Sequence, residues 1–264
     1  MRLIVLGSGS TGNVLLIESG GARVLVDAGL TAKETARRIA ANGLDPTRLD
    51  GIVITHEHSD HIKGAAVLSK TTGAPVFMSA AARSASSFPN GGEDIVWGER
   101  VSSSEPFQIG PMEFYPFGIP HDGADTFAVT VKADGIKAGI VTDLGYITQL
   151  AAERLRGCDF ILIESNHDLD LLKVGPYPWS VKQRIASRLG HLSNDETSRW
   201  LREDFDGQAR FLVLAHLSRR CNHPELARLA ALRALKARGA SFFPDAEKRV
   251  TVANHDRASE WFEF

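Results

Sequence analysis

Short apolar stretches separated by glycine-rich turns open the chain. These stretches are rich in valine, leucine and isoleucine, which is typical of β-strands. Between them, apolar residues recur at helical spacing in longer segments. The pattern predicts strands over 2–7, 13–19, 22–29, 51–55 and 75–79, and helices over 31–43 and 62–73.

The middle of the chain repeats this mixture of strands and helices, so that the pattern suggests two similar halves. Strands are predicted over 112–119, 126–133, 135–143, 159–165, 210–216, 240–244 and 249–254, and helices over 147–157, 179–190, 194–204 and 224–239. No linker, low-complexity tract or charge block divides the sequence. We therefore expect one α/β domain spanning residues 1–264, with sheets covered by helices.

Composition narrows the class of protein. With 264 residues, of which 43% are hydrophobic, the chain can bury a sizeable core, and its net charge of −2 gives no overall field that selects polyanions or membranes. Cys158 and Cys221 are too few for a disulfide framework and fit a reducing compartment. No signal-peptide core or membrane-spanning run is present, so we expect a cytoplasmic protein.

A glycine motif follows the first strand. Gly7, Gly9 and Gly12 match G-x-G-x-x-G, but a dinucleotide site needs a helix directly after the motif. Residues 13–19 have the character of a strand instead. The motif is therefore interpreted as a tight turn.

The segment "ITHEHSDHIKG", residues 54–64, is a candidate metal site. Imidazole and carboxylate ligands suit zinc, manganese or iron, and a loop after a strand can direct His56 and His58 at one ion and Asp60 and His61 at another. Further ligands are expected among polar residues that directly follow apolar strands. These residues are Asp27, His121, Asp143 and His216.

"HEHSDH", taken with those four residues in order, resembles the five-part signature of the metallo-β-lactamase superfamily. The resemblance implies a four-layer αββα sandwich, two mixed sheets flanked by helices, and two divalent ions. Asp27 would hold the metal-binding loop by hydrogen bonds. His58 stands where redox di-iron relatives carry a carboxylate, which favours hydrolysis. The implied ligands are His56, His58 and His121 for one ion and Asp60, His61 and His216 for the other, with Asp143 bridging both.

The stretch "GHLSN", residues 190–194, resembles a further motif of the phosphodiesterase branch. In that branch His191 would protonate the departing oxygen or bind the phosphate, while the alternative is a helix cap made by Ser193 or Asn194. Together with "ESNHD" and "GPYPWSVKQRI", it makes the chain similar to WalJ (YycJ)-like nucleases, regarded as 5′-to-3′ DNA exonucleases. His167 in "ESNHD" would lie near the site or orient a loop.

The charge of one segment favours a nucleic-acid substrate. Residues 173–220 hold nine basic and five acidic residues, a local +4 that leaves −6 for the rest. The basic residues could contact phosphates and the aromatic ones could stack on a base, although a solvated helix face and simple packing are equal alternatives. The candidates are Lys182, Arg184, Arg188, Arg219, Arg220, Tyr177 and Trp179.

The sequence therefore predicts a two-metal phosphodiesterase acting on nucleic acid, a 5′-to-3′ DNA exonuclease in the branch it resembles. Asp60 would bind metal and orient the attacking water, and His191 would assist the leaving group. One alternative is an acyl hydrolase, a glyoxalase-II-like thioesterase or a lactonase, using the same two metals. Another is a non-enzymatic partner or sensor that keeps the metals for structure.

Overall fold

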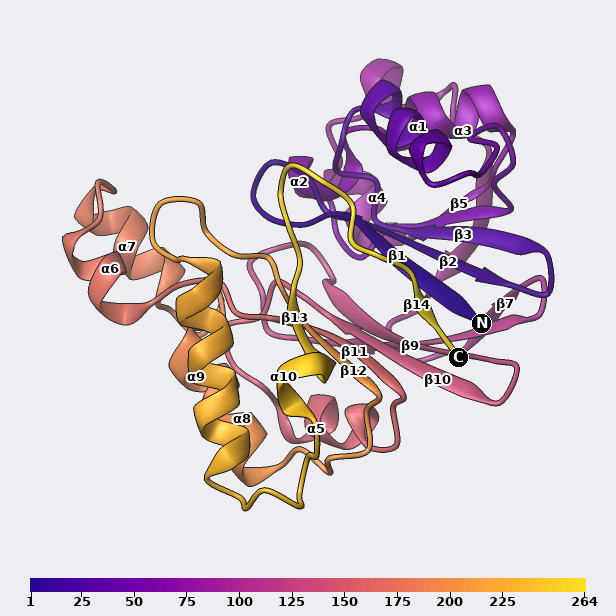
Figure 1. Cartoon of the computed structure of the whole chain (residues 1–264). Helices are drawn as coiled ribbons and strands as arrows, with labels where there is room; N and C mark the ends of the chain where they lie inside the picture. Colours follow the sequence, from indigo (N-terminus) through magenta and orange to yellow (C-terminus); the bar gives the residue numbers. More distant parts are fainter.

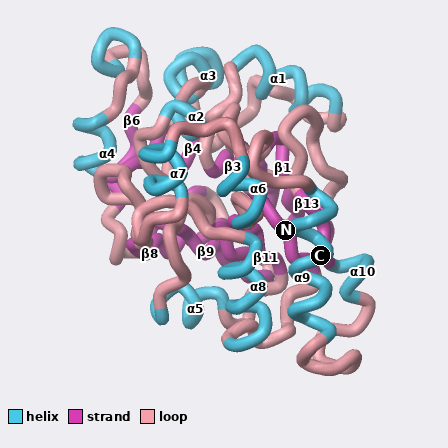
Figure 2. The backbone as a smooth tube through the Cα atoms, turned by 90° about the vertical axis from the view of Figure 1, so that its left-hand side faces the viewer, coloured by secondary structure: helices cyan, strands magenta, loops and turns pink.

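Two seven-stranded sheets face each other, and helices cover their outer sides (Figure 1). This computed structural model describes residues 1–264. Seen after a quarter turn, the strands occupy the centre and the helices surround them (Figure 2). The arrangement is the α/β sandwich expected from the sequence. None of its helices is both long and apolar enough to cross a membrane.

The first sheet is built mainly from the first hundred residues. Its order is β14-β1-β2-β3-β4-β5-β6, with antiparallel pairing from β14 to β3 and parallel pairing from β3 to β6. The strands are β1 (Arg2–Gly7), β2 (Val14–Ser19), β3 (Ala22–Val26), β4 (Gly51–Val53), β5 (Val76–Ser79), β6 (Trp97–Val101) and β14 (Phe262–Glu263).

The second sheet repeats this plan. Its order is β13-β12-β11-β10-β9-β8-β7, antiparallel from β7 to β10 and parallel from β10 to β13, so the two similar halves are real. The strands are β7 (Phe107–Ile109), β8 (Met112–Gly118), β9 (Phe127–Ala133), β10 (Ile136–Val141), β11 (Phe160–Glu164), β12 (Phe211–Ala215) and β13 (Val250–Val252).

The helices divide between the two sheets and a projecting segment. Helices α1 and α3 cover the first sheet, α5, α8 and α9 cover the second, and α6 and α7 project from the body (Figure 1). Their bounds are α1 (Ala32–Ala41), α2 (Ser59–Ile62), α3 (Ala65–Thr72), α4 (Ala80–Ala85), a 3-10 turn (Pro89–Gly92), α5 (Gln149–Leu155), α6 (Leu169–Val174), α7 (Trp179–Ile185), α8 (Asn194–Glu203), α9 (Pro224–Lys236) and α10 (Ala246–Arg249).

Strand alternation explains the continuous apolar runs. Leu3 and Val5 of β1 enter the core between the sheets, whereas Ile4 and Leu6 pack beneath the outer helices. Side chains alternate across a strand, and both faces of these strands are buried. Three apolar layers result, one between the sheets and one beneath each set of helices.

Three predicted elements differ from the structure. Residues 240–244 form a turn instead of a strand. Successive side chains of a strand point to opposite faces, whereas Phe242 and Phe243 both pack on Phe205, just beyond α8. The helix predicted over 62–73 is broken at Gly64, where a side chain would lie 2.4 Å from the Leu30 carbonyl oxygen. The helix predicted over 179–190 ends at Ile185.

Candidate metal centre

Three of the expected site residues follow strands in a left-handed backbone conformation. Asp27 follows β3 with φ 61°, Asp143 lies two residues beyond β10 with φ 61°, and His216 follows β12 with φ 53°. Residues other than glycine pay a conformational cost there, and such strain persists where the surrounding structure enforces it, typically at functional sites. The sharp turns bring the polar side chains to one edge of the facing sheets.

Three imidazoles converge to form one half of the site. The Nε2 atom of His56 lies 3.1 Å from Nδ1 of His58, which lies 3.3 Å from Nε2 of His121. One nitrogen from each ring lies within 4.8 Å of the other two. His56 is fully buried, whereas His58 keeps 30% of its side chain exposed at the pocket.

The other expected ligands form the second half of the site. His61 Nε2 lies 3.1 Å from Asp143 Oδ2, and His216 Nε2 lies 3.4 Å from Asp60 Oδ2. Asp60, His61 and His216 together offer three atoms within 4.8 Å. The structure also places Asp143 in a group with His56 and His61, between the two halves. All seven residues expected to bind metal therefore meet in one place.

Hydrogen bonds to the outer ring nitrogens set the orientation of three imidazoles. Nδ1 of His61 lies 2.8 Å from Asp27, Nδ1 of His121 3.2 Å from the Gly190 carbonyl, and Nδ1 of His216 2.7 Å from Glu164. These partners only accept, so each Nδ1 carries the proton. Nε2 of each ring then faces the centre, as metal-binding imidazoles require.

Asp27 has the orienting role expected for it. Its carboxylate accepts hydrogen bonds from the Thr55 amide at 2.9 Å and from the Thr55 hydroxyl at 3.0 Å. The Thr55 oxygen is thereby free to accept from Nδ1 of His56, 3.0 Å away. A single buried carboxylate thus aligns His56 and His61, one from each half of the site.

The charges of this centre call for a cation. Burial alone would raise the pKa of Asp143, but His216 and His61 hold it well below its usual value. Burial lowers the pKa of His216, yet Asp143, Asp60 and Glu164 raise it well above the usual value. Asp143 Oδ2 and His216 Nε2 are buried and make no well-directed hydrogen bond, although His61 and Asp60 lie 3.1 and 3.4 Å from them. Such orphaned atoms beside paired carboxylates fit a divalent metal ion.

Glu164, the last residue of β11, is a site residue that the sequence did not single out. Its fully buried carboxylate lies 2.9 Å from Nδ1 of His191 and 2.7 Å from Nδ1 of His216, and it accepts from the amides of Leu144 and Leu192. Burial opposes its ionisation, but the His191 and His216 rings lower the pKa of Glu164 to about 2. Its only sequence signal was its place in "ESNHD".

His191 stands at the wall of the metal pocket. This pocket has a volume of about 280 Å³ and is lined by His58, Asp60, Asp143, His216 and His191, among others. Ser193 also caps α8, since its hydroxyl accepts from the Glu196 amide at 3.1 Å. The cap and the histidine are separate features of "GHLSN", and both are present.

The residues expected to contact nucleic acid take different positions. Tyr177 and Arg184 line the metal pocket, and Arg184 pairs at 2.6 Å with Asp122, which lies 3.5 Å from Nε2 of His58. Arg219 pairs with Asp256 at 2.5 Å, and Lys182 donates to the Lys173 carbonyl.

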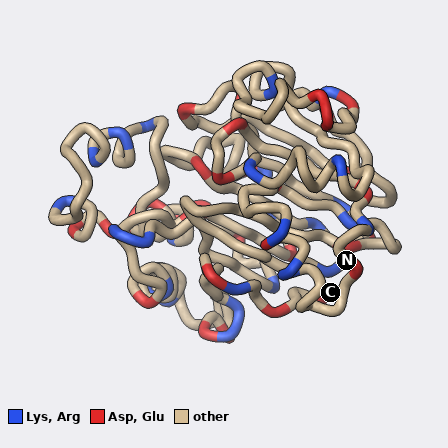
Figure 3. The backbone as a smooth tube through the Cα atoms, turned by 90° about the horizontal axis from the view of Figure 1, so that it is seen from above, with Lys and Arg blue, Asp and Glu red and all other residues tan.

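Two further candidates lie on the projecting segment or beside it. Trp179 is 70% exposed, and the Arg220 guanidinium lies 5.9 Å from the Tyr177 ring. Along the projecting segment, from α6 to α7, basic residues outnumber acidic ones (Figure 3). Arg188 and His167 line a second pocket beyond His191.

The glycine motif forms the expected turn. β2 follows it, and a side chain at Gly12 would lie 2.7 Å from Gly29. The turn supports the site, because the Ser8 hydroxyl accepts from the His216 amide at 2.7 Å and Ser10 lines the metal pocket.

Comparison with known proteins places the chain in a family. Residues 22–217 match the beta-lactamase superfamily domain. The chain is 34% identical to exodeoxyribonuclease YycJ of Bacillus anthracis over 90% of both chains, and 34% identical to exodeoxyribonuclease WalJ of Streptococcus pneumoniae over 88% of this chain and 87% of that one. The metallo-beta-lactamase fold protein YhfI of Bacillus subtilis superposes with a TM-score of 0.72 at 18% identity, covering 98% of this chain and 100% of that one. The chain therefore belongs to the metallo-β-lactamase superfamily of hydrolases, in the branch that contains YycJ and WalJ.

Proposed function

We propose that this protein is a 5′-to-3′ DNA exonuclease that uses two divalent metal ions. The observation that carries the proposal is His191, which is held by Glu164 at the wall of the metal pocket, 3.6 Å from Asp143. A proton donor beside two sets of metal ligands suits cleavage of a phosphodiester, whose leaving oxygen needs a proton. The YycJ and WalJ relatives are exodeoxyribonucleases, which supports DNA as the substrate.

The residues divide between two ions. His56, His58 and His121 would hold the first, Asp60, His61 and His216 the second, and Asp143 would bridge them. Zinc, manganese and iron all suit this mixture of imidazole and carboxylate ligands. When bound, two such ions activate water and offset the charge that develops on the phosphate.

Two residues of the protein would act on the reacting groups, one by orienting the attacking water and the other by supplying a proton. Asp60 is 20% exposed at the pocket and would orient the attacking water through its free oxygen. Nδ1 of His191 donates to Glu164, so the imidazolium form of the ring would offer the proton on Nε2 to the leaving oxygen. Burial lowers the pKa of His191, but Glu164 more than offsets this and raises it above the usual value. Glu164 therefore favours the protonated form of His191 that a proton donor requires.

The cytoplasm is the proposed location. Cys158 and Cys221 are both buried and free, which fits a reducing compartment.

Replacing His58 with alanine tests the metal mechanism. The substitution removes the ligand that lies between His56 and His121, so cleavage of labelled single- and double-stranded DNA should fall by at least ~10³-fold, because metal-assisted water activation is lost. In the unaltered protein, a 5′ label should be released at once as a mononucleotide, while a 3′ label should remain on a ladder of shortening products.

His223→Asn is the matched control, because His223 is exposed and only caps α9. Circular dichroism should show the same fold for both variants. Undiminished cleavage by the H58A protein would contradict the metal mechanism. If the protein is instead a thioesterase or lactonase, the unaltered protein turns over those esters, and His191→Ala leaves that turnover nearly intact.

A further inference from the structure

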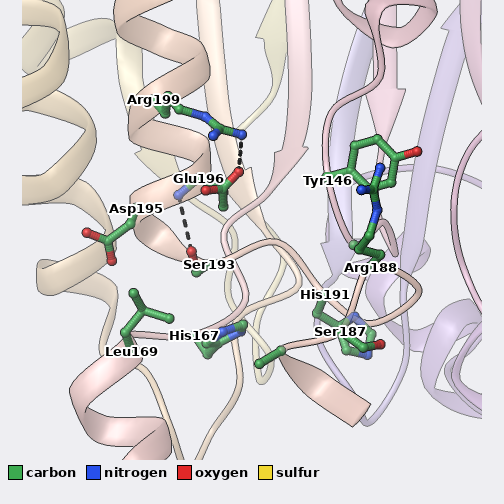
Figure 4. Close-up of a pocket in the computed structure, with 12 residues that line it drawn as sticks. Tyr146, His167, Leu169, Ser187, Arg188, His191, Ser193, Asp195, Glu196 and Arg199 are labelled. Atoms are coloured by element: carbon green, nitrogen blue, oxygen red, sulfur yellow. Dashed lines mark hydrogen bonds and ion pairs between the residues drawn. The ribbon is translucent and has the colours of Figure 1, made fainter. Parts of the chain in front are cut away.

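A second pocket adjoins the metal pocket and shares His191 with it. Its volume is about 440 Å³, against about 280 Å³ for the metal pocket, and it falls within the range of small-molecule sites. Figure 4 shows its walls, with Tyr146 and Arg188 on one side and Asp195, Glu196 and Arg199 on the other. Two parts of one ligand that are joined at an atom next to His191 can therefore lie one in each pocket.

One wall is a stacked pair of side chains. The Arg188 guanidinium lies over the Tyr146 ring, 4.4 Å from its centroid, and makes no ion pair. The close approach depends on Gly145, where a side chain would lie 2.2 Å from the Arg188 carbonyl oxygen. The backbone is thus built to hold Arg188 beside Tyr146. Guanidinium and phenol faces both stack on nucleobases.

The opposite wall is the first turn of α8. Glu196 forms an ion pair with Arg199, so the charges of these two residues are satisfied. Asp195 is exposed and has no ion-pair partner. A free carboxylate here offers acceptors for N–H donors and repels a second phosphate.

His167 forms the floor of this pocket. Its side chain is only 1% exposed, and Nδ1 has no hydrogen-bond partner. The backbone of His167 is fixed by the Asn194 amide, which donates to its carbonyl at 2.9 Å. A buried polar atom without a partner is rare, and a buried water molecule is one way to satisfy it. His167 thus lies in the second pocket, separate from the metal ligands.

Charge and shape together select the ligand. The charge of His191 is paired with Glu164, so Arg188 and Asp195 leave one unpaired cation and one unpaired anion on opposite walls, and neither sign is in excess. A dianionic phosphate gains little from such a pair, whereas a nucleobase presents a flat face to one wall and N–H donors to the other. We propose that this pocket binds the nucleoside of the leaving nucleotide, an inference that rests on the proposed function.

The reaction geometry follows from the shared histidine. Water attacks phosphorus and loses one proton to the solvent of the metal pocket, the new P–O bond forms, and the bond from phosphorus to O3′ of the terminal nucleotide breaks. O3′ takes the proton of His191, and the new 5′-phosphate stays on the shortened strand. Because His191 separates the two pockets, the nucleoside bearing O3′ lies in the second pocket while the phosphate lies over the metal ligands. A pocket for one nucleoside favours removal of nucleotides one at a time.

Tyr146→Ala tests the pocket directly. Both proteins are loaded with metal and titrated calorimetrically with the four deoxynucleoside 5′-monophosphates. The Y146A protein should bind them about fivefold to a hundredfold more weakly than the unaltered protein, the usual effect of losing a stacked aromatic ring. Deoxyribose 5-phosphate lacks a base, so its affinity should barely change. Asp195→Ala should weaken binding of dGMP, whose base edge carries an amino group and a ring N–H, more than binding of dTMP, whose base edge carries one ring N–H. The KM for a dinucleotide should rise more than kcat falls.

Tyr115→Ala is the matched control, since Tyr115 lies on β8 outside both pockets. If the Y146A and D195A proteins match this control in nucleotide affinity and in KM, the pocket inference is wrong while DNA cleavage still supports the proposed function. If the unaltered protein does not cut DNA, the proposed function fails, and the binding titration still decides whether the pocket holds a nucleoside.

Discussion

A single carboxylate, that of Glu164, fixes two imidazoles with different tasks. One is a proposed metal ligand, His216, and the other is the proposed proton donor, His191. Both rings present Nδ1 to the same oxygen, so the position of one depends on the position of the other. Two backbone amides hold the second oxygen of Glu164 and prevent the carboxylate from rotating.

Glu164→Gln should therefore impair metal binding and catalysis together. The amide keeps the shape but replaces one charged acceptor, and loss of such an orienting partner typically costs 10–100-fold in affinity or activity. Metal content by mass spectrometry and kcat on labelled DNA check this. Glu153→Gln, on the exposed side of α5, serves as control. A loss of kcat without any loss of metal would show that Glu164 acts through His191 alone.

The expected ligands were predictable because each lies at a recognisable place in the pattern. Asp27 and His216 directly follow apolar strands, and the turn after each strand directs them to the same edge. Glu164 gave no such signal, since it ends a strand and pairs with Ala215 in the sheet. The sequence does not show that its side chain is buried between two imidazoles.

At the scale of elements, the turn after β3 supports the metal-binding loop. A side chain added at Gly29 would lie 1.6 Å from the Asp60 carbonyl oxygen, which itself accepts from the Asn13 amide at 2.8 Å. The turn, the glycine loop and the start of α2 thus pack backbone against backbone. Nothing larger than hydrogen fits at Gly29.

Gly29→Ala should displace the backbone of Asp60 and weaken both stability and metal binding. Overpacking of this kind typically costs about 1–3 kcal/mol, which chemical denaturation can measure. Gly118→Ala is the control, because a side chain there meets nothing within 4 Å. Equal stability and metal content in the two variants would show that the turn yields without disturbing Asp60.

Most strands, including the three-residue β4 and β13, and the longer helices followed from the sequence, whereas several edge strands and short helices did not. The strands with buried faces and the amphipathic helices α1, α8 and α9 lie where the pattern placed them. The edge strands β6, β7 and β14 and the short helices α2, α4, α6 and α10 were missed. Each has few residues, so position in the sheet or on its edge determines it more than local propensity.

At the scale of the whole molecule, one apolar layer joins both sheets. Leu3 and Val5 of the first sheet share it with Phe160 and Val213 of the second. Neither sheet can lose this contact without exposing the inner face of the other. We therefore propose that residues 1–264 form a single cooperative unit.

Thermal unfolding tests this proposal. Far-UV circular dichroism and tryptophan fluorescence should report one coincident transition, since Trp97 packs against the first sheet and Trp200 against the second. Zinc or manganese at 100 times its dissociation constant should raise the Tm by roughly 5–10 °C, and a chelator should reverse the rise. Two separate transitions would show that the halves unfold independently.

The metal ligands come from both halves of the chain. His56, His58, Asp60 and His61 follow a strand of the first sheet, and His121, Asp143 and His216 belong to the second. Each ion would need residues from both sides, so neither half could have possessed this chemistry before the two were joined. The hydrolytic centre therefore exists only where the two sheet edges face each other, and a half produced alone would carry at most four of the seven ligands.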